Sequence, residues 1–236
     1  MYKGKRILAV IPARGGSKGL PNKNIKELNG KELIYHTIGQ ANDSELIDFV
    51  AVSTEDAIIK GLCEFTDTFV IDRPEYMAKD ESPSYEAVLH SIDTLKYEHG
   101  LQYDIIVMLE VTSPLRKKED IDNAIRLFIE SGSDSLVCIG KVENDSYHPN
   151  CVKFQNKLGL LEPYIVNSEP IYQRQQLKEC FAVFGGIYIS YVHSYREHKT
   201  FYQNKTVGYE VERWQMFEID DIVDFYCCEK LMDVYL

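Results

Sequence analysis

The chain has 236 residues, of which 44% are hydrophobic and 27% charged, and its formal net charge is −11, so it can bury a large core as a single domain spanning residues 1–236. The acidity argues against non-specific nucleic-acid binding, which depends on neutralising phosphates, and no apolar stretch reaches the roughly 18 residues that a membrane span needs. We therefore expect a cytoplasmic protein with no nucleic-acid partner and no membrane partner.

Buried apolar runs and helical patterns alternate over residues 6–139. Strands are expected at 6–11, 49–53, 68–71, 104–109 and 135–139. Helices are expected at 32–41, 55–64, 84–98 and 118–130. Strands that alternate with helices predict an α/β fold with a mostly parallel sheet covered on both faces.

The pattern changes at residues 144–179, which are polar, with weak strand patterns near 151–154 and 158–161. This segment indicates an insertion or arm rather than another β-α unit. Regular structure returns with strands expected at 186–190 and 206–210 and a closing helix at 221–232.

An open parallel sheet binds ligands beyond the carboxyl ends of its strands. This rule predicts that residues 12–24, 110–116 and 218–221 lie at one rim. The first of these segments carries an unusual charge for an acidic protein. The first 31 residues hold a single acidic residue, Glu27, against eight basic ones: Lys3, Lys5, Arg6, Arg14, Lys18, Lys23, Lys26 and Lys31.

A glycine-rich loop with three cations follows the first expected strand. Gly15 and Gly16 allow close approach of a ligand to backbone N–H groups. Arg14 can grip two phosphate oxygens, while Lys18 and Lys23 act as point charges. The loop matches neither GxxxxGK[ST] nor GxGxxG. It therefore predicts a clamp for a polyphosphate that is neither a standard P-loop nor a dinucleotide fingerprint.

The same stretch, IPARGGSKGLPNKNI at residues 11–25, closely resembles the signature of the CMP-sialic acid synthetases (acylneuraminate cytidylyltransferases). Other motifs of that family follow in chain order. They are an Arg-Pro nucleotide loop from residue 73 to Asp80 and Ser84, TSPLR at 112–116, QRQQL at 173–177, GGIYI at 185–189 and EID at 218–220. The resemblance covers nearly the whole chain.

The resemblance implies a Rossmann-like, mostly parallel sheet of nucleotidyltransferase type with a small inserted dimerisation arm at 144–179. It also implies a reaction in which CTP and a nine-carbon acid sugar give a CMP-sugar and pyrophosphate. Positioning and charge neutralisation would drive this reaction. The residues expected to stabilise charge on the triphosphate are Arg14, Lys18 and Lys23. The remaining residues expected to bind nucleotide are Ala13, Gly15, Asn24, Arg73 and Ser84. Those expected to face the sugar are Glu110, Thr112, Ser113, Arg174 and Phe184.

Magnesium is the cofactor that the resemblance implies, and it prefers oxygen ligands and keeps several waters. The family often has Asp-x-Asp where this chain has Glu218 and Asp220. Residues two apart in an extended segment face the same side, so we expect Asp220 as the main ligand and Glu218 as a second one, directly or through water. Asp221 is expected to cap the helix that follows, and Ser84 to cap its own helix.

The sugar side departs from the family pattern. Glu110-Val111 stands where the family commonly has Gln-Pro, and AVFGGIY at 182–188 stands where it tends to have Arg-Pro-Asn-Gly-x-Ile-Tyr. N-acetylneuraminate is the sugar that the resemblance favours, and legionaminic acid, pseudaminic acid or another acid sugar, including KDO, stays open. Arg174 is the candidate for binding the sugar carboxylate, from the partner subunit if the arm crosses a homodimer.

Three other hypotheses remain at this point. A KDO cytidylyltransferase would share the fold, although those enzymes usually lack Gly-Gly-Ser-Lys-Gly in the first loop. Another nucleotidyltransferase would use UTP, GTP or ATP. A non-catalytic nucleotide-binding homologue would keep the fold without turnover, because fold alone does not determine function.

Overall fold

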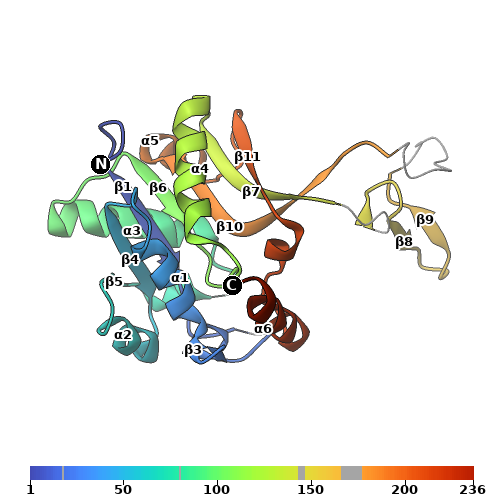
Figure 1. Ribbon diagram of the computed structural model, residues 1–236, viewed down its shortest axis with the longest axis horizontal. Helices are drawn as coiled ribbons and strands as arrows, with labels where there is room; N and C mark the ends of the chain where they lie inside the picture. Colours follow the sequence, from blue (N-terminus) through green and yellow to red (C-terminus); the bar gives the residue numbers. More distant parts are fainter. Residues whose placement is uncertain (18, 80, 143–146, 166–176) are drawn as a thin grey trace.

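A seven-stranded sheet forms the centre of the protein in the computed structural model, which describes all residues except 18, 80, 143–146 and 166–176 (Figure 1). Its strands, in spatial order, are β11 (Thr206–Val211), β7 (Ser135–Lys141), β10 (Phe181–Tyr191), β6 (Ile105–Met108), β1 (Ile7–Pro12), β4 (Phe49–Thr54) and β5 (Phe69–Asp72). β10 runs antiparallel to both of its neighbours, and the other paired strands are parallel. The predicted α/β fold with a mostly parallel sheet is confirmed.

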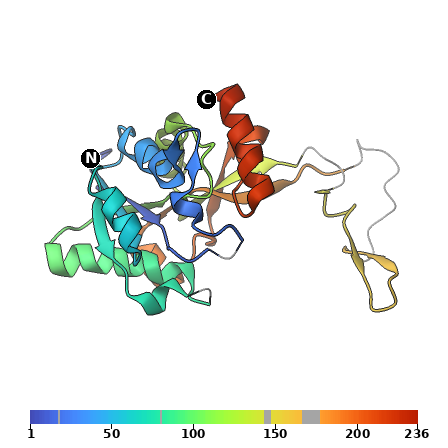
Figure 2. The same ribbon diagram turned by 90° about the horizontal axis from the view of Figure 1, so that it is seen from below.

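Helices cover both faces of this sheet (Figure 2). On one face lie α1 (Leu33–Asn42), α2 (Ala57–Cys63), α4 (Lys118–Ser131) and α6 (Ile222–Tyr235). On the other lie α3 (Ser84–His99) and α5 (Val192–His198). β1 serves both layers because its side chains alternate: Ile7 and Ile11 pack into the first cluster, and Leu8 and Val10 into the second. In the part of the chain that the structure describes, no helix is both long and apolar enough to cross a membrane.

Some elements differ from the sequence predictions. The helix expected at 55–64 starts at Ala57, because the Asp56 side chain accepts hydrogen bonds from two backbone N–H groups of its first turn. The strand expected at 186–190 is the second half of the longer β10. The short helix α5 and the small hairpin of β2 (Glu27–Leu28) and β3 (Lys31–Glu32) were not predicted.

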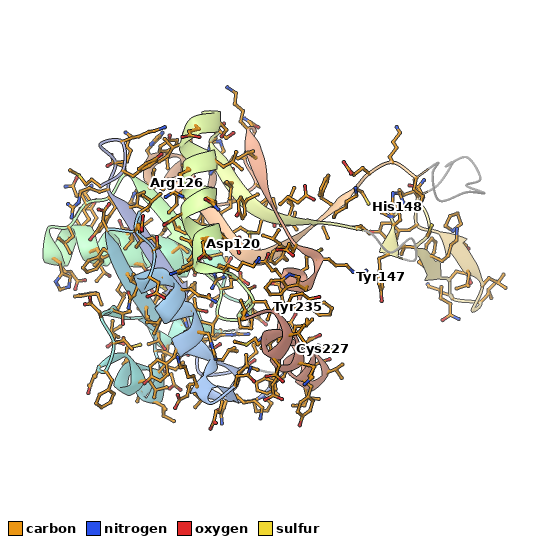
Figure 3. The ribbon with its side chains drawn as sticks, in the orientation of Figure 1. Asp120, Arg126, Tyr147, His148, Cys227 and Tyr235 are labelled. Atoms are coloured by element: carbon orange, nitrogen blue, oxygen red, sulfur yellow. The ribbon has the colours of Figure 1, made fainter. Side chains whose placement is uncertain are left out.

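The predicted insertion leaves the body between β7 and β10, and its described part lies away from the sheet (Figure 1). A two-stranded hairpin of β8 (Lys153–Gln155) and β9 (Leu161–Pro163) forms its outer part. Figure 3 shows Tyr147 and His148 on this side of the molecule, beyond the end of β7. The prediction of a strand at 158–161 is wrong for residues 158–160, because β9 begins at Leu161. Asn156 Oδ1 accepts from Leu158 N and Leu160 N and holds those residues in the turn before β9.

Candidate active site

The candidate site lies at the rim where β1, β4, β5 and β6 end. The chain runs from β1 to β4 and β5 on one side of β1 and then returns to β6 on the other. Such a reversal leaves a crevice outside the carboxyl ends of the two central strands, which is where open α/β sheets bind ligands.

Lys23 joins the glycine-rich loop to the segment before α6. It begins the short 3-10 helix η1 (Lys23–Ile25), and its Nζ donates to Ile219 O at 2.6 Å and lies 3.2 Å from Asp220 Oδ1. The Lys23 side chain is 11% exposed, whereas that of Asp220 is 81% exposed. Ile219 N in turn donates to Thr112 O at 2.8 Å. The predicted meeting of residues 12–24, 110–116 and 218–221 at one rim is therefore confirmed.

The beginning of the glycine-rich loop is held by its own backbone and by Asn24. Ala13 is buried, and its N–H donates to Ser53 O at 3.0 Å. Asn24, also buried, donates from Nδ2 to Arg14 O at 2.9 Å. The Arg14 guanidinium reaches toward the 3-10 helix η2 (Glu75–Ala78), where Nη1 lies 3.5 Å from Ala78 O. Asn24 thus fixes the loop at the residue whose side chain was expected to grip phosphate.

Arg73, expected at the cytidine, is 5% exposed and forms an ion pair with Glu55, 2.7 Å from Nη2 to Oε2. The other oxygen of Glu55 accepts from Gly15 N at 2.8 Å. Sequence reasoning missed Glu55 because it placed this residue in a helix. Its position directly after an apolar strand was the signal that could have found it.

Three of the residues expected to bind the nucleotide or the sugar are not found at the rim: one lies away from its expected capping position, and two are not among the described residues. Ser84 is exposed at the start of α3 and is not its N-cap, which is Pro83, a residue that makes no side-chain cap. Lys18 and Arg174 lie outside the described residues, as does Asp80 of the nucleotide loop. Asp221 does cap α6, accepting from Val223 N at 2.7 Å and Asp224 N at 3.1 Å, as predicted.

Two carboxylates face each other at the end of the rim where the sugar was expected. A Cβ added to Gly185 would overlap both Glu110 Oε2 and Glu218 Oε1, so a larger residue there would displace both carboxylates. Glu218 Oε1 accepts from Gly185 N at 2.7 Å and from Ser113 Oγ at 3.2 Å. Thr112 Oγ1 lies 3.4 Å from Glu110 Oε2. Burial, reinforced by the charge of Glu218, raises the pKa of Glu110 to about 7. Burial also raises the pKa of Glu218.

A buried arginine supports the wall behind this pair. Arg116 donates from Nη1 to Gly186 O and lies with Nη2 at 3.4 Å from Glu110 O. It thereby ties the loop after β6 to the irregular part of β10, where the strand register shifts between Val183 and Tyr188. Phe184 is 7% exposed and belongs to the hydrophobic core, so its ring packs inward from the rim.

Two carboxylates qualify as metal ligands here. Asp220 and Glu218 offer the oxygen donors that Mg²⁺ prefers, and Mg²⁺ needs only one or two protein carboxylates. Asp220 is exposed and fits this role, whereas Glu218 already accepts two hydrogen bonds. Among the described residues, no group of three or more His, Cys, Asp or Glu side chains forms a closed metal cage.

Comparisons with solved structures show which known proteins share this fold. A CMP:2-keto-3-deoxy-manno-octonic acid synthetase solved with CTP superposes with a TM-score of 0.71 at 17% identity, covering 98% of this chain and 100% of the other. A 4-diphosphocytidyl-2C-methyl-D-erythritol synthase from Anaerococcus prevotii superposes with a TM-score of 0.65 at 11% identity, covering 98% and 100%. Both likenesses concern the fold.

The cytidylyltransferase family model matches residues 8–236, so the chain belongs to that family, as its resemblance to the CMP-sialic acid synthetases predicted. It is 31% identical to an N-acylneuraminate cytidylyltransferase of Streptococcus agalactiae over 92% of its length, but it spans only 51% of that relative. It is 30% identical to a CMP-N,N'-diacetyllegionaminic acid synthase of Legionella pneumophila over 97% of both chains.

Replacing Glu110 by glutamine tests the facing carboxylates. In the folded protein Glu110 keeps its proton up to about pH 7, whereas in the unfolded chain it ionises near its ordinary value of 4.5. Wild-type stability therefore falls as pH rises between these two values and stays lower above them. Glu110→Gln has no such loss, so its stability should match that of the wild type at pH 4 and exceed it by about 3 kcal/mol at pH 8.

The measurement is urea unfolding across this pH range in metal-free buffer. Glu119→Gln, which removes an exposed carboxylate from α4, is the matched control and should leave the pH profile unchanged. If the stability of the wild type does not fall relative to that of Glu110→Gln as the pH rises, the raised pKa of Glu110 is contradicted.

Proposed function

We propose that this protein is a cytidylyltransferase that activates a nonulosonic acid, converting CTP and the acid sugar into a CMP-sugar and pyrophosphate. The contact of Lys23 with Ile219 and Asp220 is the observation that carries the proposal. It joins, across most of the chain, the two segments to which the family resemblance assigns the triphosphate and the metal. Family membership supports the same reaction.

The acid sugar is proposed by class, with N-acetylneuraminate first. The Streptococcus agalactiae relative bears the name of an N-acylneuraminate enzyme, and the Legionella pneumophila relative, which matches over 97% of both chains, that of a legionaminic acid enzyme. A pseudaminic acid cytidylyltransferase of Campylobacter jejuni is 26% identical over 96% of both chains. These sugars share an anomeric hydroxyl, which would attack the α-phosphate of CTP, and a carboxylate, by which the protein would recognise them.

The proposed roles follow the order of groups along the rim. Arg14 and Lys23 would bind the triphosphate and stabilise negative charge on the departing pyrophosphate, since fixed cations lower the cost of charge that develops during reaction. Asn24 would hold Arg14 in place through the backbone. Lys18 would add a third cation and Arg73 would bind the cytidine. Glu110, Thr112 and Ser113 would face the hydroxyl and amide groups of the sugar.

Mg²⁺ is the proposed cofactor, with Asp220 as its main protein ligand and Glu218 contributing through water. When bound, the ion would neutralise triphosphate charge and polarise the phosphorus that is attacked. Lys23 already lies 3.2 Å from Asp220, so the protein holds one cation at this carboxylate before any metal binds.

A homodimer is proposed from the arm. Its described residues expose large apolar side chains that the protein's own body leaves uncovered: Phe154, Leu158, Leu160, Leu161 and Tyr164 are between 43% and 81% exposed. Such a concentration of apolar surface on a protruding hairpin favours association with another surface. A second copy of this chain is the partner that the family resemblance implies.

Pyrophosphate release from CTP tests the function. The wild type should release pyrophosphate with CTP, Mg²⁺ and one sugar from a panel of nonulosonic acids and KDO, and not with UTP, GTP or ATP. Lys23→Met should lower kcat/KM about 100-fold by removing a cation from the triphosphate. Lys31→Met, which removes an exposed lysine from β3, is the matched control and should retain full activity. Absence of release with every sugar would contradict the proposal.

The metal proposal predicts the behaviour of Asp220→Asn. Losing the exposed carboxylate should raise the Mg²⁺ concentration needed for half-maximal pyrophosphate release at least tenfold, with smaller change at saturating Mg²⁺. Asp233→Asn, which removes an exposed carboxylate from α6, serves as the control. An unchanged Mg²⁺ requirement in Asp220→Asn would remove Asp220 from the metal site.

The dimer proposal predicts that charge on the arm weakens association. The wild type should sediment as a dimer, and Leu158→Asp combined with Leu161→Asp should shift it toward monomer, because burying an unpaired carboxylate is costly. Lys157→Ala alters the same hairpin without touching its apolar side chains and should sediment like the wild type. A wild type that sediments as a monomer at micromolar concentration would contradict the proposal.

A further inference from the structure

Glu55 connects two parts of the nucleotide site that lie 58 positions apart in the numbering, Gly15 and Arg73. Its Oε1 accepts from Gly15 N at 2.8 Å. Its Oε2 accepts from Arg73 Nη2 at 2.7 Å and lies 3.3 Å from Nε. The side chains of Arg73 and Glu55 are 5% and 17% exposed. A largely buried carboxylate with these three contacts holds a backbone amide and a guanidinium in one fixed geometry.

The backbone around Glu55 is itself fixed. It follows β4 directly, and Arg73 N donates to Thr54 O at 3.0 Å, which keeps the ends of β4 and β5 together. The next residue, Asp56, caps α2 through Oδ1, and its Oδ2 occupies the position that a Cβ on Gly15 would need. Asp56 therefore packs against Gly15, and Glu55 accepts a hydrogen bond from its backbone N–H.

We propose that Glu55 is a positioning residue of the nucleotide site, which orients Arg73 for the cytosine ring and sets its distance from the phosphate-binding loop. This inference rests on the proposed function, in which that loop holds the triphosphate and Arg73 the cytidine. Glu55 itself carries no contact to the ligand in this role. It acts through the two groups that it holds.

The chemistry of the guanidinium gives this role a consequence for base selection. Arginine presents its donors in a rigid, planar fork, so occupying Nε and Nη2 fixes the direction of the remaining donor, Nη1. Among the described residues, Nη1 of Arg73 makes no hydrogen bond. Cytosine offers the acceptors O2 and N3 along one edge, whereas uracil carries a hydrogen on N3. A donor held at N3 therefore favours CTP over UTP, whereas a guanidinium that can turn meets O2, which accepts in both bases, and loses that preference.

Glu55→Gln is the main variant, because an amide has one acceptor oxygen and cannot serve both Gly15 and Arg73. Arg73→Lys is the second variant, since it keeps the charge but loses the fork. Asp72→Asn is the matched control. It breaks the exposed ion pair of Asp72 with Lys60, 2.6 Å long, which joins the end of β5 to α2 close to the Glu55–Arg73 pair in sequence.

The experiment measures CTP and UTP binding by calorimetry, and kcat and KM for CTP and the sugar, on the full chain. Glu55→Gln should raise the Kd for CTP about tenfold, leave the KM for the sugar unchanged and reduce the preference for CTP over UTP. Arg73→Lys should do the same. The double variant should be no weaker than either single one, because both disrupt a single coupled unit. Asp72→Asn should bind both nucleotides like the wild type.

Each result decides between specific possibilities. If the losses of CTP affinity add in the double variant, or if Glu55→Gln keeps its preference for CTP over UTP, the positioning role of Glu55 is overturned. The proposed function is not affected by either result. A Glu55→Gln protein that does not fold, together with an Arg73→Lys protein that keeps its preference for CTP, assigns the ion pair to stability and overturns the role as well. A wild type that does not bind CTP overturns the proposed function, and the inference with it.

Discussion

The hydrogen-bonded ladders on both sides of β1 decide where every polar group of this site lies. Val10 pairs with Ala51 on β4 and with Met108 on β6, so three parallel strands reach the same rim in register. Both faces of β1 are buried, and a slip by one residue would turn its two sets of side chains to the wrong layers. The loops beyond these strands therefore start from fixed points, and short side-chain contacts such as that of Lys23 with Ile219 can connect them.

Acidic residues play opposite parts at the two ends of the rim. At the end where the nucleotide is proposed to bind, Arg73 neutralises Glu55, and the Glu55 carboxylate also accepts from a backbone amide. At the sugar end, Glu110 and Glu218 face each other, and burial with the neighbouring charge raises the pKa of Glu110 to about 7. Charge is thus balanced at the pair beside the proposed cytidine position, whereas acid is in excess where the proposed sugar would lie. A protonated Glu110 relieves that excess, since a neutral carboxyl can donate a hydrogen bond to the ligand.

The sequence was informative where the signal was local and periodic. Alternating apolar strands and amphipathic helices predicted the parallel sheet and the rim, and the glycine-rich loop with its cations was recognisable by composition. Two kinds of feature could not be predicted from the sequence. The reversed direction of β10 and the meeting of Glu110 with Glu218 across Gly185 depend on tertiary packing between segments distant in sequence. The position of Glu55 at the rim could not be predicted, because the expected helix began at Glu55. In the structure Asp56 is the N-cap of α2, which leaves Glu55 in the loop after β4.

The arm is attached to the body by two chain segments that are already paired with each other. Phe181 pairs with Lys141 where β10 meets β7, and just beyond them Val142 N donates to Cys180 O at 3.0 Å. The entrance and exit of the insertion are consequently adjacent, and its outer length can change without altering the order of the strands. This part can therefore be lengthened, shortened or exchanged for another hairpin while the strands that form the rim keep their places. Engineering could use the same junction as a grafting point, with Lys141 and Phe181 as the fixed ends.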